Sequence, residues 1–198
     1  MSATAAATAL DPEFFDRPPR PVARDLIGCE LRYEGVGGII VETEAYEAED
    51  EACHAFIGRT SRTDVLFGPP GRAYVYLCYG IHRMLNVVTE PDGTAAAVLI
   101  RALEPRAGIE TMCGRRGAAG ISARNLCSGP GKLCEALGIE LDLTRASLTE
   151  APFSLTGREP GARRPRIVAG PRIGITKAAD LPWRYCLAGS PYLSAPEG

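Results

Sequence analysis

The segment spanning residues 37–46, GGIIVETEAY, constrains the fold of this chain more than any other. Its apolar part predicts a β-strand, and Glu42 and Glu44 make the end of that strand acidic. Residues 29–33 predict a preceding strand, with Glu34 and Gly35 as the turn between the two. We therefore expect a β-hairpin that holds a carboxylate in a fixed place, as an acid/base group requires.

Glycine and proline residues divide the rest of the chain into short elements. Further strands are predicted at residues 73–79, 85–89, 95–103, 152–156, 167–168, 173–175 and 183–187, with a turn at 80–83. Helices are predicted at 21–27, 108–113 and 132–137, and long loops at 47–72 and 114–125. The pattern favours a single-domain α+β fold with a mostly antiparallel, curved or barrel-like sheet, a few helices and a protruding β-hairpin.

The chain is long enough to bury a sizeable core. It has 198 residues, of which 45% are hydrophobic, and its 22 glycines and 16 prolines are spread so evenly that no linker stands out. The first residues are small and apolar, without the charged start or the cleavage-like end of a secretory signal. We expect residues 1–12 to form a disordered tail and residues 13–198 to form one domain.

Cysteine usage bears on the compartment and on metal binding. Seven cysteines occur without any CxxC spacing. An odd number in a chain without a signal peptide is typical of reduced, buried thiols in a cytoplasmic protein. A zinc site is the alternative, but the chain has two histidines and no close pair of ligands. We therefore expect no metal, and no apolar run is long enough to span a membrane.

Charge is distributed unevenly along the chain, whose formal net charge is −2. That value argues mildly against a nucleic-acid partner, yet arginines are concentrated in residues 101–132 and 158–172. These segments are compatible with a face that contacts phosphates, and equally with solvated loops. The run SGPGK at 128–132 predicts a helix start, where free N–H groups and Lys132 favour a phosphate; an ordinary helix cap is the alternative.

Several side chains are candidates for one chemical site. Glu44 is a better acid/base candidate than Glu42, because it lies two residues before Tyr46 on the same face of an extended strand. Arg101 follows an apolar stretch of a predicted strand that we expect to be buried. A buried arginine needs a carboxylate partner, and we expect this partner to be Glu44. Paired tyrosine rings would stack a flat heterocycle, although they could instead pack the core, and a lone histidine is often structural. The remaining candidates are His54, Tyr74, Tyr76, Tyr79 and Asn86.

Several motifs in order make the sequence similar to a known family. They are VETEAY (41–46), the acidic loop that ends at His54, RTDVLFGPPGRAYVYLCYGIHRMLNVVT (62–89), VLIRALEP (98–105), LCSGPGKLCEALGI (126–139), RIGI (172–175) and GSPYLS (189–194). Across residues 14–194 the chain resembles the alkyladenine (3-methyladenine) DNA glycosylases, in particular a bacterial member. The resemblance implies that residues 13–198 form a catalytic, DNA-binding domain.

The resemblance also implies roles at the reacting centre. Glu44 would activate a water against the anomeric carbon of a flipped nucleotide, and Arg101 would help to hold that carboxylate and water. Tyr46, His54 and Tyr76 would form the base pocket. A backbone group near Ile173 would complete the water site, and Asn86 would exclude the 2-amino group of guanine.

The implied partner is double-stranded DNA that contains a damaged purine, such as 3-methyladenine, hypoxanthine or ethenoadenine. Tyr79 would be the wedge that enters the minor groove, and the phosphate contacts would come from Arg59, Arg62, Gly131 and Lys132. Neither Lys132 nor Lys177 lies in a pocket motif, so no amine is available for a Schiff base. We expect a monomeric, monofunctional, cofactor-free enzyme of base excision repair, cytoplasmic and associated with the nucleoid of a bacterium.

Two other functions use parts of the same pattern. A non-catalytic nucleic-acid-binding module would need the basic segments and the wedge, but not Glu44 and Arg101. A small-molecule N-ribosyl hydrolase would need neither the wedge nor the arginine segments. The chain also departs from mammalian members: the 114–125 loop is short and lacks lysine, the loop before His54 is one residue shorter, and His82 and Arg83 replace aromatic residues.

Overall fold

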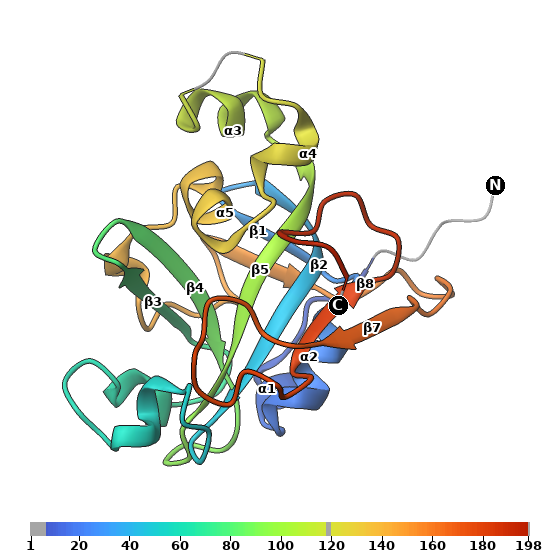
Figure 1. Ribbon diagram of the computed structural model, residues 1–198. Coiled ribbons are helices and arrows are strands. Elements are labelled where there is room, and N and C mark those ends of the chain that lie inside the picture. The colour runs from blue at the N-terminus through green and yellow to red at the C-terminus, as the bar shows by residue number, and fades with distance from the viewer. Residues whose placement is uncertain (1–6, 118–119, 198) are drawn as a thin grey trace.

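The computed structural model describes residues 7–117 and 120–197. The chain folds as a single-domain α+β structure around a curled, antiparallel half-barrel sheet (Figure 1), which confirms the predicted fold class. Strands follow the order β3-β4-β5-β2-β1-β6, and β8 pairs with both β2 and β7. No helix of the described chain is both long and apolar enough to cross a membrane.

Two long strands form the centre of the sheet. They are β2 (Val36–Glu47) and β5 (Ala96–Ala107), which pair antiparallel over nearly their whole length. Strand β1 (Glu30–Tyr33) pairs with the start of β2, so the predicted hairpin is confirmed. Because Leu99 of β5 lies opposite Glu44, the carboxylate is delivered to the middle of the sheet rather than to a loop.

The two glycines that open β2 are required by its close packing. A Cβ on Gly37 would lie 2.0 Å from the carbonyl oxygen of Leu31, and one on Gly38 would lie 2.0 Å from that of Glu104. The pairing of β2 with β5 shifts register at this point and again around Glu42. Such bulges bend a strand and increase its twist, which curls the sheet towards the half-barrel.

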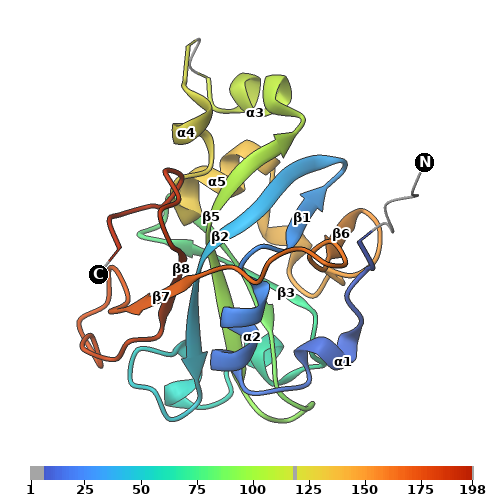
Figure 2. The same cartoon turned by 90° about the vertical axis from the view of Figure 1, so that its right-hand side faces the viewer.

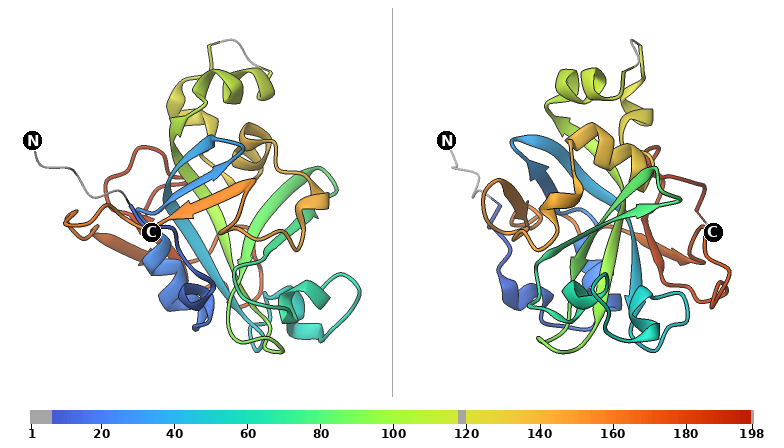
Figure 3. Two further views of the ribbon diagram at one scale, coloured as in Figure 1. Left: turned by 180° about the vertical axis from the view of Figure 1, so that it is seen from behind. Right: turned by 90° about the vertical axis from the view of Figure 1, so that its left-hand side faces the viewer.

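A β-hairpin extends from one edge of the sheet (Figure 3). It consists of β3 (Ala73–Cys78) and β4 (His82–Val88), and only the last residues of β4, from Asn86 on, pair with β5. The free part of the hairpin is therefore the protruding element that we predicted. The turn predicted at 80–83 is wrong in its second half, because His82 pairs with Cys78 and already belongs to β4.

The remaining strands are β6 (Phe153–Thr156), β7 (Ile167–Gly170) and β8 (Arg184–Leu187). The strand predicted at 173–175 is wrong: these residues are a loop. Gly174 adopts a positive φ of 78°, and the amide of Ile173 donates to the Glu44 carboxylate instead of to a neighbouring strand. A short apolar run with a central glycine predicts a strand. Here, however, a backbone amide of the run donates its hydrogen bond to a side-chain carboxylate and not to another strand.

Five α-helices of the described chain cover the sheet: α1 (Pro12–Phe15), α2 (Pro19–Leu26), α3 (Ile109–Arg115), α4 (Ala123–Leu126) and α5 (Pro130–Leu137). Helix α2 lies against β2, as Figure 2 shows from the side of that helix. It buries Val22 and Leu26. Helix α5 packs on β4 and β5 and ends at Gly138, as predicted. Short 3-10 segments occur at η1 (His54–Ile57), η2 (Asp64–Phe67) and η3 (Leu141–Leu143).

Two predicted loops contain local structure. The 47–72 loop holds η1 and η2, and the 114–125 loop holds the start of α4, which the Gly/Ala/Arg-rich sequence did not predict. Of the predicted disordered tail, residues 1–6 lie outside the described residues. Beyond them, Ala9 bridges to Thr156 and the amide of Leu10 donates to the carbonyl of Leu155 at 2.9 Å.

Candidate active site

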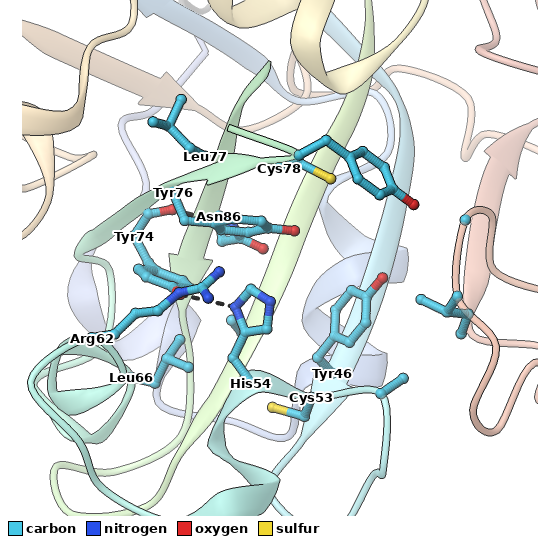
Figure 4. A pocket seen from close by; sticks show the side chains of 15 residues that line it. Tyr46, Cys53, His54, Arg62, Leu66, Tyr74, Tyr76, Leu77, Cys78 and Asn86 are labelled. Atoms are coloured by element: carbon cyan, nitrogen blue, oxygen red, sulfur yellow. Dashed lines mark hydrogen bonds between the residues drawn. The ribbon is translucent and has the colours of Figure 1, made fainter. Parts of the chain in front are cut away.

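A cavity of about 320 Å³ opens between β2, the β3–β4 hairpin and two loops. Figure 4 shows Tyr46 on the β2 side, Tyr76 and Asn86 on the hairpin side, and His54 between them. The loop that contains Gly174 forms the remaining wall. The lining includes four tyrosines and His54 beside aliphatic and polar groups, which suits a small, flat ligand.

Glu44 lies directly behind this cavity, and its side chain is fully buried. Its Oε2 accepts hydrogen bonds from the Tyr46 hydroxyl at 2.9 Å and from Arg101 at 3.1 Å. Its Oε1 accepts from the backbone amide of Ile173 at 2.8 Å. Three donors fix the carboxylate, so the predicted Arg101–Glu44 pair and the predicted proximity of Ile173 are both observed.

Glu42, two residues earlier on the same strand face, has a different environment. Its carboxylate accepts from Arg101 at 2.9 Å and from Arg184 at 2.8 Å. The amide and the hydroxyl of Ser194 both donate to it at 2.6 Å. Burial alone would raise the pKa of Glu42, but Arg101, Ser194 and Arg184 together hold it below its ordinary value. Glu42 therefore has the contacts of a structural residue: its carboxylate holds the guanidinium of Arg101, which also binds Glu44.

The aromatic groups of the cavity contact one another closely. The rings of Tyr74 and Tyr76 stack with centroids 5.3 Å apart, because side chains two residues apart in a strand share a face. The ring of His54 meets Tyr76 edge-on at 4.5 Å, and its Nδ1 lies 2.9 Å from the Tyr74 hydroxyl. Burial, with a smaller contribution from Arg62, lowers the pKa of His54 to about 4, so the imidazole is neutral at physiological pH. The amide of Asn86 donates to the carbonyl of Tyr74 at 3.1 Å, which fixes its orientation.

The Tyr46 hydroxyl is both a donor to Glu44 and part of the cavity wall. Burial, and then the charge of Glu44, raise its pKa far above the ordinary value, so the proton stays on the tyrosine. Burial is offset at Arg101 by Glu44 and Glu42, which raise the pKa of its guanidinium and keep it charged. The Glu44 carboxylate is therefore buried beside the cavity, and the groups that donate hydrogen bonds to it keep their protons.

Comparisons with known proteins agree with this geometry. The family model described as "Methylpurine-DNA glycosylase (MPG)" matches residues 13–191. The chain belongs to this family. Proteins that carry the name "Putative 3-methyladenine DNA glycosylase" are similar over most of their length. The one from Rhodopseudomonas palustris (strain HaA2) is 55% identical and the match covers 92% of this chain and 89% of that protein; the one from Nitrosospira multiformis is 54% identical, covering 88% of each.

The predicted family and its DNA glycosylase activity are thereby confirmed, and a DNA substrate follows from the family. Tyr79 of this glycosylase lies at the tip of the hairpin, where 87% of its surface is exposed. It adopts a positive φ of 51° and also contributes to the rim of the cavity. The neighbouring Ile81 is exposed as well, so an apolar tip projects beside the cavity mouth.

The residues predicted to contact phosphate differ in their positions, and only Arg62 lines the cavity of the glycosylase. Arg59 is exposed, paired with Asp64 at 3.3 Å. Arg62 reaches into the wall of the cavity, with its guanidinium carbon 5.5 Å from the centre of the Tyr76 ring. Gly131 lies in the first turn of α5 against His82 of the hairpin, where an added Cβ would come within 3.2 Å of that side chain. Helix α5 thus packs against the β3–β4 hairpin close to its tip, and Lys132 follows Gly131 in the same turn.

Sequence reasoning missed the group that supports the cavity of the glycosylase from outside. Arg172 and Asp50 form a buried ion pair with both side chains fully buried. The sequence signal was indirect: Asp50 belonged to an acidic loop, and Arg172 to a basic run that ended in the motif RIGI. A pairing across 122 residues cannot be read from spacing. Ser194 and Arg184, the partners of Glu42, were missed for the same reason.

A metal centre has no counterpart in the described part of the chain, where no three His, Cys, Asp or Glu side chains come together. The seven cysteines are free, and burial raises the pKa of Cys53, which lines the cavity, to about 11.

Proposed function

We propose that this glycosylase turns a damaged purine out of duplex DNA and hydrolyses its N-glycosidic bond, leaving an abasic site. The observation that carries the proposal is the buried carboxylate of Glu44, fixed by Arg101, Ile173 and Tyr46 immediately behind an aromatic cavity. A base inside a duplex cannot be reached by such a buried group. Enzymes that act on a base therefore take it out of the stack, as DNA glycosylases in general do.

The chemistry follows from the charge of Glu44. As the purine leaves with the bonding electrons of the C–N bond, the sugar becomes oxocarbenium-like and positively charged. An ionised carboxylate next to the anomeric carbon stabilises that charge and accepts a proton from the water that forms the new C–O bond. Arg101 and Ile173 keep the carboxylate in place as the water attacks. A general base in this position contributes about 10²- to 10⁴-fold to the rate.

The cavity supports recognition of a flat, modified purine. Tyr46 and Tyr76 stand on opposite sides of it, so a base between them would contact aromatic surface on both faces (Figure 4). The neutral His54 offers a ring nitrogen to the edge of that base. Purines of the 3-methyladenine, hypoxanthine and ethenoadenine class are the substrates that we propose, because normal purines stay paired and stacked at lower free energy.

Asn86 supports a steric basis for rejecting guanine. Its side chain is buried and held by the Tyr74 carbonyl, so it cannot turn away from a 2-amino group. We expect Asn86→Ser to create excision activity on guanine or on alkylated guanine. The measurement is release of the base from duplexes that contain it, and absence of any new activity would place the steric gate elsewhere.

The exterior of the site supports binding of duplex DNA by a monomer. Tyr79 would fill the gap left by the base and recover part of an unstacking free energy of about a few kcal/mol. Arg59, Arg62, Lys132 and the amide of Gly131 would contact the phosphates around it. We place this reaction in base excision repair on the nucleoid DNA of a bacterial cytoplasm.

A water nucleophile is favoured over an amine. Lys132 lies 3.4 Å from the Ser128 hydroxyl, and Lys177 is paired with Glu51 on the surface at 3.0 Å. Neither lysine lines the cavity. An enzyme that forms a Schiff base needs such an amine at the reacting carbon. We therefore propose a monofunctional enzyme that needs no cofactor and has no lyase step.

Two further hypotheses account for less of the structure. A non-catalytic DNA-binding module has no use for a buried Glu44 with three donors, because burying a charge is unfavourable. A small-molecule N-ribosyl hydrolase has no use for an apolar, exposed hairpin tip.

The proposal is tested with Glu44→Gln and a panel of duplexes that each carry one modified purine. We expect single-turnover excision to fall by about 10²-fold or more, with the affinity for damaged duplex retained, because only the base is lost. Glu47→Gln is the matched control, since Glu47 ends the same strand but pairs with Arg20 at the surface. Excision by Glu44→Gln at a rate close to wild type would show that another group activates the water.

A further inference from the structure

Arg172 occupies an unusual position for a charged residue. Its guanidinium lies between two aromatic rings, 4.7 Å from the centroid of Tyr46 and 5.0 Å from that of Trp183. Asp50 binds it through both carboxylate oxygens, one of them 3.0 Å from Nη2. Both side chains of the ion pair are completely buried.

The same guanidinium binds the backbone of two segments. Its Nη1 donates to the carbonyl of Ala45 at 2.9 Å, which belongs to the peptide group that joins Ala45 to Tyr46. Its Nη2 donates to the carbonyl of Ala178 at 3.4 Å, which closes the loop that carries Ile173. Because Ile173 directly follows Arg172, any movement of Arg172 also moves the amide that donates to Glu44 at 2.8 Å.

The loop has few other anchors on this side of the site. Strand β7 ends at Gly170 and β8 begins at Arg184, so residues 171–183 belong to no strand. The amide of Ala45 donates to the carbonyl of Trp183 at 2.9 Å, which fixes the far end of this segment. On the surface, Lys177 pairs with Glu51. At Arg172 and Ile173 themselves, hydrogen bonds run to Asp50, Ala45, Ala178 and the Glu44 carboxylate.

We propose that Asp50 and Arg172 form a positioning pair for base excision, which sets the Ile173 amide against Glu44 and the Tyr46 ring against the base. The inference rests on the proposed role of Glu44. It adds a second layer behind the reacting groups: Asp50 orients Arg172, and Arg172 orients the amide and the ring that touch carboxylate and substrate.

An ion pair suits this task better than apolar packing. Replacing a buried ion pair by apolar residues is often neutral or stabilising, so stability alone does not account for such a pair. A planar guanidinium, however, donates in several fixed directions at once, and it stacks on aromatic faces. Lysine has a single charged nitrogen and cannot satisfy Asp50, Ala45 and Ala178 together while it stacks on Tyr46.

The test compares Asp50→Asn and Arg172→Lys with the wild type, in the full chain. Hydrogen exchange at Ile173 reads the position of the amide directly, and we expect it to become about tenfold faster or more while the β5 amides keep their protection. Single-turnover excision should fall by about 10- to 100-fold, because a small misplacement of a reacting group has an effect of this size. Affinity for damaged duplex should stay close to wild type.

Glu51→Gln provides the matched control. It removes an ion pair with Lys177 that joins the same two segments, but this pair is exposed and does not touch Ile173 or Tyr46. Exchange, excision and affinity should all remain at wild-type values. A comparable loss in Glu51→Gln would show that any link between the two loops suffices, which overturns a specific role for Arg172.

Other outcomes separate this inference from the proposed function. Unchanged exchange at Ile173 in both variants overturns the inference, whatever the excision rates are. Excision and duplex affinity that fall together, in proportion to the folded fraction from thermal unfolding, also overturn it, because the pair is then merely structural. Should the wild type or Glu44→Gln contradict the proposed function, the exchange measurement still decides whether Arg172 places the Ile173 amide.

Discussion

At the scale of single residues, Glu42 and Glu44 differ in the ion pairs that they form. Both carboxylates are buried on one face of β2 and share Arg101, yet Glu42 also neutralises Arg184. Removing the charge of Glu42 leaves a buried arginine without a charged partner, whereas after loss of Glu44 the guanidinium of Arg101 still has Glu42. We therefore expect the two residues to contribute differently: Glu42 to the fold, and Glu44 to the proposed reaction.

We predict that Glu42→Gln lowers the free energy of unfolding by about 3–5 kcal/mol, the range for breaking a buried ion pair from one side. Glu44→Gln should lower it much less. Urea unfolding of both variants at neutral pH measures the difference. A Glu42→Gln variant that is as stable as Glu44→Gln would contradict the structural role of Glu42.

His54 gives a prediction about pH. Its pKa is lowered by burial from the ordinary 6.5 to about 4, so below pH 6.5 the unfolded chain binds a proton that the folded chain does not. The contribution of the neutral His54 side chain to the free energy of unfolding is therefore fully present above pH 6.5. It is lost as the pH falls towards 4. For a partly exposed ring, screening by solvent reduces the contribution to about 1–2 kcal/mol.

The measurement is urea unfolding of wild type and His54→Gln at about pH 7 and about pH 4.5. Glutamine cannot titrate but keeps a polar group near the Tyr74 hydroxyl. Between the two pH values the wild type should lose about 1–2 kcal/mol more than the variant, because only the wild type carries the histidine. Equal losses would mean that His54 is protonated in the folded protein.

Sequence alone located the residues of the site that lie within local motifs. Glu44 and Tyr46 follow from strand periodicity, and Arg101 from its buried approach. Arg172 and Asp50 could not be found, because a buried ion pair is defined by two segments that meet only in the folded chain. Likewise, no pattern distinguishes the Ser194 that caps Glu42 from the other serines of the C-terminal segment.

At the scale of elements, the β3–β4 hairpin supplies the proposed contact between the site and DNA. Tyr74 and Tyr76 lie two residues apart in β3, so strand alternation puts them on one face, where their rings stack. Tyr79 escapes this alternation because the turn begins there with a positive φ. The loop at 173–175, by contrast, was predicted as a strand from its short apolar run. Its amide partner, the Glu44 side chain, is remote in sequence, so the local pattern could not reveal the loop.

We predict that Tyr79→Ser weakens base flipping without affecting the fold. The side chain is 87% exposed, so its loss removes few contacts within the protein. It does remove the ring that would fill the gap in the stack, which recovers part of about a few kcal/mol. Fluorescence of 2-aminopurine beside the lesion reports flipping, and thermal unfolding reports the fold. If the variant and the wild type gave the same fluorescence on binding, the wedge would be another residue. The exposed Ile81 is the next candidate, because it lies two residues from Tyr79.

At the scale of the whole molecule, the charge distribution has to explain how a chain of net charge −2 binds a polyanion. The acidic residues 47–51 are engaged on the side of Trp183 and Lys177, where Asp50 and Glu51 have cationic partners. Arg62 lies instead in the wall of the cavity, and Lys132 follows Gly131, which packs against His82 of the β3–β4 hairpin. Cations at these positions would attract DNA locally although the net charge of the chain is negative.

Salt dependence of binding tests this distribution. Each phosphate that a cation neutralises contributes about −0.9 to the slope of log K against log salt concentration. With Arg59, Arg62 and Lys132 as the contacts, we predict a slope of about −2.7 for a duplex that contains hypoxanthine. Lys132→Gln should reduce its magnitude by about 0.9, whereas Lys177→Gln, which removes a surface cation that is not among the proposed contacts and pairs with Glu51, should leave it unchanged. Equal effects of the two substitutions would mean that DNA senses the net charge of the chain rather than the surface around the wedge.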